Sequence, residues 1–144
     1  MLKRSLIVIA LALAAAVAAQ AQKASVDVPG IKGTAAYADV LLRKTEVQAD
    51  LEAFGQDYTD ASPKMLDLRV ELASLERSSE RILAVKAAQA DRLTDALGKM
   101  MVKKAALDAE LAHLNRTYAK EHPDVRRAQR RADLFAAAIE DILK

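Results

Sequence analysis

The chain has 144 residues, contains no cysteine and carries a formal net charge of +2 at pH 7. This length allows a single domain, and the lack of cysteine excludes a disulfide framework. The positive excess comes from Lys3 and Arg4, because residues 1–21 contain no acid and the remaining chain has 20 basic and 20 acidic residues, which gives no reason to expect a nucleic-acid partner.

The first 21 residues have the pattern of a secretory signal. Lys3 and Arg4 precede an apolar run over 6–18, and Ala19-Gln20-Ala21 fits the small-x-small pattern of a cleavage site. The run is shorter than the stretch of about 20 apolar residues that spans a membrane, and an uncleaved anchor is the alternative. We therefore expect export to the periplasm or secretion, with cleavage near Ala21.

Residues 22–33 contain one proline and two glycines and show no helical period, so they are predicted to form a flexible leader. The domain that follows, 34–144, is rich in Ala, Leu, Glu, Lys and Arg, which favour helices. Its apolar residues recur at alternating steps of three and four, the a/d spacing of a heptad. An all-α fold built from antiparallel coiled-coil hairpins is therefore predicted.

The first predicted helix covers about 35–57 and leads into a turn that contains Tyr58, Ser62 and Pro63. Proline cannot continue a helix but suits its first turn. Ser62 is a good N-cap for a helix that begins at Pro63. The turn therefore predicts a second helix that folds back on the first.

The apolar spacing of the second helix predicts one continuous rod over 63–118. Two successive steps of four, on either side of Leu93, form a stutter that would locally unwind a supercoil. Gly98 lies beside it, and a single glycine costs about 1 kcal/mol in a helix without ending it. A break near 94–98 is the alternative.

A second turn, with the same chemistry as the first, precedes a last helix predicted over 123–143. Its residues are Tyr118, His122 and Pro123. The two turns lie 60 residues apart, and the apolar stripes before them coincide at the same offset. Self-similarity at a fixed period indicates an internal repeat of two hairpin units, 37–83 and 97–143.

The hairpins are expected to associate with a second copy, because a two-helix hairpin buries only a narrow stripe. In the rod arrangement the section 84–96 also lacks a helix to cover it. A homo-oligomer, most simply a dimer, is therefore predicted.

The second turn resembles a segment of the periplasmic coiled coil of Wzz-type polysaccharide co-polymerases. The resemblance rests on the pattern Tyr118-x3-His122-Pro123-x-Val125 after leucine-rich helix, and the first turn has a degenerate version. It implies hairpin geometry and involvement in polysaccharide export, and it transfers no catalytic residue. Members of that family also carry two transmembrane helices, which this sequence does not show.

No residue pattern in the sequence indicates a catalytic, cofactor or metal site. Glu110 and His113 have a spacing seen in metal-binding bundles, but a site needs more ligands than these two. His113 is better explained as a solvated residue, and His122 as a turn residue. The sequence also lacks a Gly-rich phosphate loop and an activated nucleophile, so an enzyme is not expected.

A basic cluster near the start of the last helix has two interpretations. It consists of Arg126, Arg127, Arg130 and Arg131. The first interpretation is a solvated face whose long stems cover the apolar stripe. The second is a patch for an anionic partner, a polysaccharide or a lipid surface, with salt-sensitive binding.

These observations predict a non-enzymatic, exported coiled-coil scaffold or adaptor of the bacterial cell envelope that acts through helix–helix association. One alternative is a periplasmic holdase chaperone similar to the Skp class, which is also small, exported and helical. Another is an accessory factor of polysaccharide export. An adaptor would bind one envelope protein, whereas a holdase would bind many unfolded clients.

Overall fold

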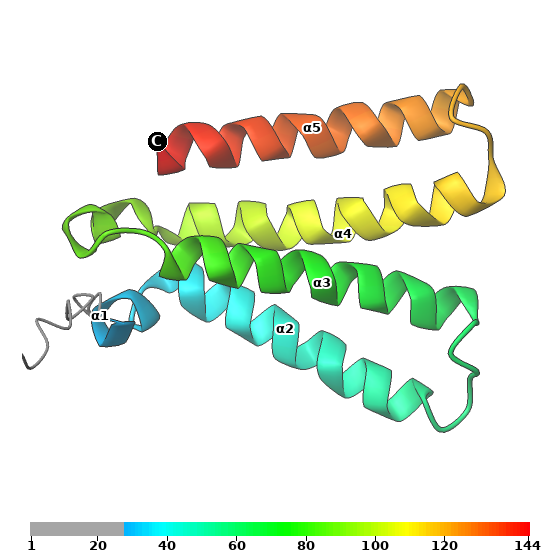
Figure 1. Cartoon of the computed structure of the whole chain (residues 1–144), viewed down its shortest axis with the longest axis horizontal. Helices are drawn as coiled ribbons and strands as arrows, with labels where there is room; N and C mark the ends of the chain where they lie inside the picture. The colour runs from blue at the N-terminus through cyan, green and yellow to red at the C-terminus, as the bar shows by residue number, and fades with distance from the viewer. Residues whose placement is uncertain (1–27) are drawn as a thin grey trace, which may run out of the picture.

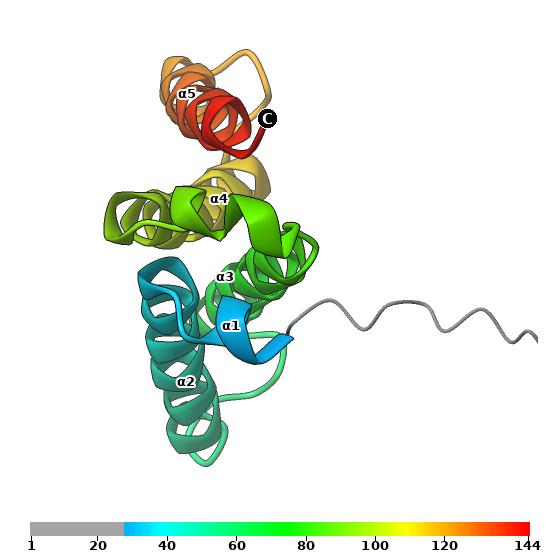
Figure 2. The ribbon, with the colours of Figure 1, turned by 90° about the vertical axis from the view of Figure 1, so that its left-hand side faces the viewer.

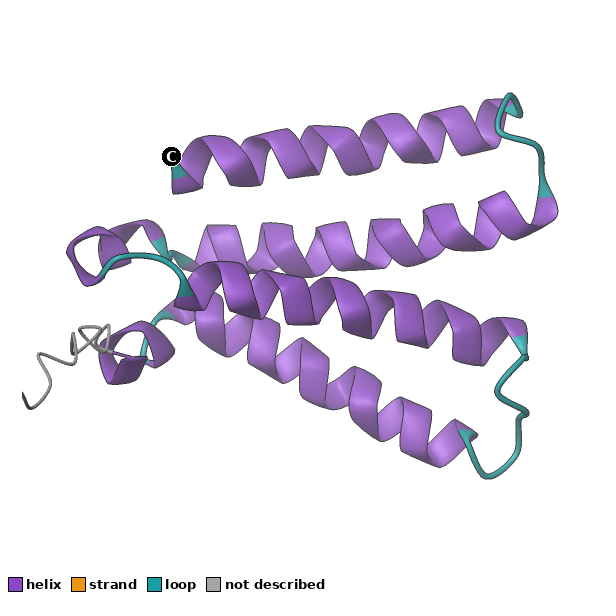
Figure 3. Ribbon diagram, in the orientation of Figure 1, coloured by secondary structure: helices purple, strands orange, loops and turns teal. Residues whose placement is uncertain are grey.

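The computed structural model describes residues 28–144 and is all-helical over that range (Figures 1 and 3). The predicted signal, 1–21, and the first part of the predicted leader lie outside the described residues. The helices are α1 (Val28–Lys32), α2 (Ala35–Phe54), α3 (Pro63–Leu83), the 3₁₀ helix η1 (Ala87–Arg92), α4 (Asp95–Thr117) and α5 (Pro123–Leu143). Within this range no helix combines the length and apolar character that a membrane crossing requires.

The four long helices run alternately in opposite directions (Figure 1). α2, α3 and α4 all pack against one another, and α5 packs on α4 at the other side of that group (Figure 2). The core lies between the first three long helices and reaches the last turns of α5. Its buried members are Ile31, Ala36, Val40, Val47, Leu68, Leu75, Ile82, Leu93, Leu97, Met101, Ala105 and Ile139.

Local capping explains where the long helices begin. The Oγ1 atoms of Thr34 and Thr94 accept hydrogen bonds from backbone amides three residues later, as does the Oγ of Ser62. His122 caps α5 through Nδ1, which accepts a hydrogen bond from the backbone amide of Asp124 at 3.2 Å. Each cap satisfies an amide that has no partner within the helix.

The predicted helix boundaries at both prolines are confirmed, since α3 begins at Pro63 and α5 covers 123–143. The first helix ends at Phe54, three residues before the expected 57, because Gly55 caps it with bonds to the carbonyls of Leu51 and Ala53.

The prediction of one rod over 63–118 is wrong. The chain leaves the helix after Leu83, passes through η1 and re-enters a helix at Asp95, so α3 and α4 lie side by side instead of end to end. The break begins well before the alternative position of 94–98. Tertiary contacts hold it: Leu93 is buried in the core, and its carbonyl accepts a hydrogen bond from the amide of Ala36.

The end of the predicted leader is not a flexible segment. Residues 28–32 form α1, whose Ile31 is buried in the core, and α1 contacts η1 as well as α2 and α3. Leu93, the one buried residue of the section 84–96, is likewise covered within the chain and needs no second copy to cover it.

The two halves of the structure have matching elements 60 residues apart. α2 and α4 begin at Ala35 and Asp95 after threonine caps, and α3 and α5 cover 63–83 and 123–143. The offset equals the repeat found in the sequence. Each long helix of the first half thus has a counterpart in the second.

Candidate functional site

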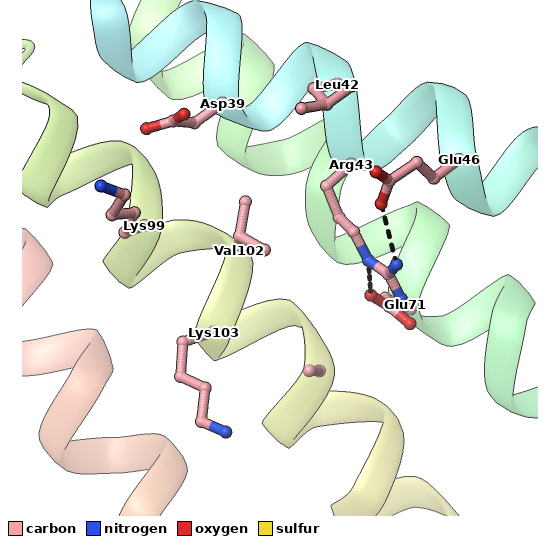
Figure 4. A pocket seen from close by; sticks show the side chains of 9 residues that line it. Asp39, Leu42, Arg43, Glu46, Glu71, Lys99, Val102 and Lys103 are labelled. Carbon is pink, nitrogen blue, oxygen red and sulfur yellow. Dashed lines mark hydrogen bonds and ion pairs between the residues drawn. The ribbon is translucent and has the colours of Figure 1, made fainter.

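A groove with a volume of about 510 Å³ runs along the surface between α2 and α4 (Figure 4). Leu42 of α2, 62 % exposed, and Val102 of α4 extend toward it, and Ala106 continues the apolar part of its lining. Charged residues occupy the two walls: Asp39, Arg43 and Glu46 on α2, and Lys99 and Lys103 on α4. The groove is therefore amphipathic, with one wall of net acidic charge and one basic wall.

Arg43 fixes one end of the groove (Figure 4). Its Nε donates a hydrogen bond to Oε1 of Glu71 on α3 at 2.7 Å, and its Nη1 donates to Oε2 of Glu46 at 3.0 Å. The bond to Glu71 is the main reason that the pKa of Arg43 is raised above its usual value. Glu71 is buried, so this pair holds the groove floor in place.

The other end of the groove is narrow because Gly98 allows α4 to approach α2. A Cβ at Gly98 would lie 2.8 Å from Cα of Ala36, closer than real Cβ contacts. Lys99 stands beside this contact, and its Nζ donates to Oδ2 of Asp95 at 2.7 Å. That bond is the main reason that the pKa of Lys99 is raised.

A cluster of polar side chains lies at the α3–α4 interface. The Oγ of Ser74, which is buried, donates to Oδ2 of Asp108 at 2.6 Å. Nζ of Lys104 binds the same carboxylate at 2.7 Å. Lys104, which interrupts the apolar stripe in the sequence, thus has a partner inside the bundle.

The predicted turn residues have structural roles in the connections between α2 and α3 and between α4 and α5. The rings of Tyr118 and His122 stack with their centroids 4.3 Å apart, which orients His122 as a cap. Tyr58 packs edge-on against Phe54 with a centroid distance of 5.8 Å. Both tyrosines are about half exposed.

The structure divides the four arginines of the predicted cluster into two that form ion pairs and two that do not. Arg127 binds Asp124, lowering the pKa of that carboxyl, and Arg131 reaches Glu110 at 3.5 Å. Arg126 and Arg130 make no ion pair within the described residues and line a hollow of about 560 Å³. Its other lining residues are Asn115, Lys120, Val125 and Gln129. This hollow offers three cations to an anionic group.

The structure gives Glu110 and His113 separate polar partners, Arg131 for Glu110 and Asp67 for His113. Nδ1 of His113 lies 3.1 Å from Oδ2 of Asp67, which also binds Arg116. In the part of the chain that the structure describes, no three acidic or histidine side chains come together in a metal-binding group.

Sequence reasoning missed the groove because its residues lie off the apolar stripe and on three helices. The one sign of the groove in the sequence was Leu42, an apolar residue beside the stripe at a heptad position that does not face the interior. The approach of α2 to α4 could not be read from spacing, since the sequence predicted a rod.

Comparison with protein-family models, curated proteins and solved structures finds no significant match for this chain.

Proposed function

We propose that the chain is a non-enzymatic scaffold or adaptor of the cell envelope, built from coiled-coil-like hairpins, that binds an amphipathic helix of a partner protein in the groove between α2 and α4. The observation that carries the proposal is the amphipathic character of that groove, with Leu42 and Val102 between an acidic and a basic wall. The signal-like N-terminus supports placement in the envelope.

The chemistry of the groove favours a helix over a small molecule. Grooves that bind helices read apolar anchors at steps of three and four and use flanking charges for selection. A partner helix with an apolar stripe, basic residues facing Asp39 and Glu46, and acidic residues facing Lys99 and Lys103 complements both walls. The lining residues, by contrast, provide no nucleophile paired with a base.

The experiment measures binding of fluorescent helical peptides to the purified protein by anisotropy. One peptide has an apolar stripe with a basic flank and an acidic flank; two controls have the same stripe with both flanks acidic or both basic. We expect the mixed peptide to bind about tenfold more tightly, equal to about 1.4 kcal/mol. Leu42→Lys should abolish that binding, because it places a charge in the apolar part of the groove lining.

Two results would contradict the proposal. Equal binding of all three peptides would indicate a surface without charge selection, as expected of a holdase. Binding that Leu42→Lys leaves unchanged would place the peptide elsewhere. Leu134→Lys, at a leucine of α5 that is also largely exposed, is the control for a general effect of added charge.

A further inference from the structure

Within residues 28–144, α5 packs extensively against α4 alone (Figure 2), and it leaves a stripe of residues uncovered beside that contact. The stripe follows heptad spacing and consists of the exposed Arg127, Arg131 and Leu134 and the half-buried Ala138. Leu134 is 71 % exposed, the most exposed of the large apolar side chains described. A single exposed leucine needs no explanation by itself, but its counterpart in the other half of the chain does explain it.

The stripe of α5 is the counterpart of the face by which α3 packs on α4. Leu134 lies 60 residues after Ser74, which is 3 % exposed and donates a hydrogen bond to Asp108 of α4. Arg127 lies 60 residues after Asp67, which binds an arginine of α4. α5 therefore presents to solvent the surface that α3 uses as an interface.

α2 presents the complementary face at the opposite end of the bundle. Leu41 is 45 % exposed, whereas its counterpart Met101 on α4 is 1 % exposed and belongs to the core. The remaining exposed residues of this α2 stripe are Ala38, Thr45, Gln48 and Glu52. Thus α2 leaves open the surface by which α4 meets α3.

We propose that copies of this chain associate head to tail, with the Leu134 stripe of α5 in one copy packed against the Leu41 stripe of α2 in the next. The contact repeats the α3–α4 packing that already joins the two halves within the chain. Because its two sides are different surfaces, it generates a ring or an open chain of copies instead of a closed two-fold dimer. This association does not depend on what the groove between α2 and α4 holds.

Charge supports the pairing. Asp67 of α3 meets His113 and Arg116 near the end of α4. By the repeat offset, Arg127 faces Ala53 and Gln56 at the end of α2, and Glu52 is the acidic residue of the exposed stripe beside them. In the internal contact the acid is on α3 and the base on α4, whereas between copies the base is on α5 and the acid on α2. The two charges are opposite in both contacts.

The contact between copies is not an exact replica of the internal one. Ala38 stands where α4 has Gly98, and its Cβ prevents the close approach that α4 makes to α2. The pairing therefore rests on α5 and α2 and not on a copy of the α2–α4 crossing.

Sedimentation velocity of the purified protein over a range of concentrations tests the proposal. The wild type should grow beyond a dimer as concentration rises. Leu41→Glu and Leu134→Glu each block one surface and should be monomeric alone, whereas an equal mixture should form a one-to-one dimer that grows no further. Arg127→Glu should weaken association at least tenfold, and mixing it with Glu52→Arg should restore the contact.

Three outcomes overturn the proposal. One is a wild type that stays monomeric at all concentrations. The second is Leu41→Glu leaving association intact, which indicates a symmetric contact through α5 alone. The third is a mixture of the two leucine variants that stays monomeric. Circular dichroism checks the fold of each variant, and Leu41→Gln or Leu134→Gln replaces any glutamate variant that loses helix. Leu42→Lys should leave association unchanged, which separates this inference from the function of the groove.

Discussion

Gly98 of α4 lies directly against the backbone of Ala36 of α2, so that a Cβ at Gly98 would stand 2.8 Å from Cα of Ala36. Gly98→Ala should therefore destabilise the protein by about 1–3 kcal/mol, the usual cost of overpacking, despite the better helix propensity of alanine. Urea unfolding followed by circular dichroism measures the change. The matched control is Ala96→Gly at an exposed position of the same helix. It measures the effect of helix propensity on stability without a change in packing. A stabilised Gly98→Ala variant would show that the helices are not in contact there.

The bond between Arg43 and the buried Glu71 should matter more than the bond between Arg43 and the exposed Glu46. Glu71→Gln removes a charge-assisted hydrogen bond below the surface and should cost about 1.5–3 kcal/mol. Glu46→Gln is the control and should cost under about 1 kcal/mol, because water and salt screen an exposed pair. Equal costs in urea unfolding would contradict the assigned role of Glu71 in the groove floor.

The cap at the start of α3 gives a third prediction. Ser62→Ala removes the oxygen that accepts a hydrogen bond from the amide of Met65 at 3.3 Å. It should lower the free energy of unfolding by about 1 kcal/mol. Ser62→Asp keeps an acceptor and should retain most of the stability. If Ser62→Asp loses as much as Ser62→Ala, the hydroxyl is not acting as a cap.

The helix boundaries at Ser62-Pro63 and His122-Pro123 could be predicted because local chemistry sets them. The break between Leu83 and Asp95 could not be predicted from periodicity, because the residues there favour helix and the apolar steps continue across it. What ends α3 is tertiary: burial of Leu93 and its bond to the amide of Ala36. Thr94 before Asp95 was the local sign of a new helix start.

The candidate site depended on that break. The groove exists because α4 turns back beside α2 and α3, which a continuous rod would prevent. The sequence could place Leu42 on an outer face of α2 but could not say that Val102, sixty residues later, would stand across from it. The arginine cluster was visible as composition, whereas its division into paired and unpaired members required the neighbouring acids Asp124 and Glu110.

That division gives a test of the anionic partner, which is one of the two interpretations of the cluster. Arg126 and Arg130, with Lys120, line the hollow between α4 and α5, whereas Arg127 and Arg131 are already paired. If the partner is an anionic lipid surface, replacing Lys120, Arg126 and Arg130 together by alanine should weaken binding to phosphatidylglycerol vesicles roughly 100-fold, at about 1 kcal/mol for each cation.

Replacing Arg127 and Arg131 by alanine is the matched control for that vesicle experiment, and it should have a smaller effect because Asp124 and Glu110 already offset their charge. Vesicle sedimentation measures binding, with uncharged phosphatidylcholine vesicles as a blank. Binding should disappear at about 1 M salt, where the Debye length is about 3 Å. Binding that survives this salt, or equal loss from both sets of substitutions, would mean that the hollow does not select an anionic surface, and the cluster would then be a solvated face.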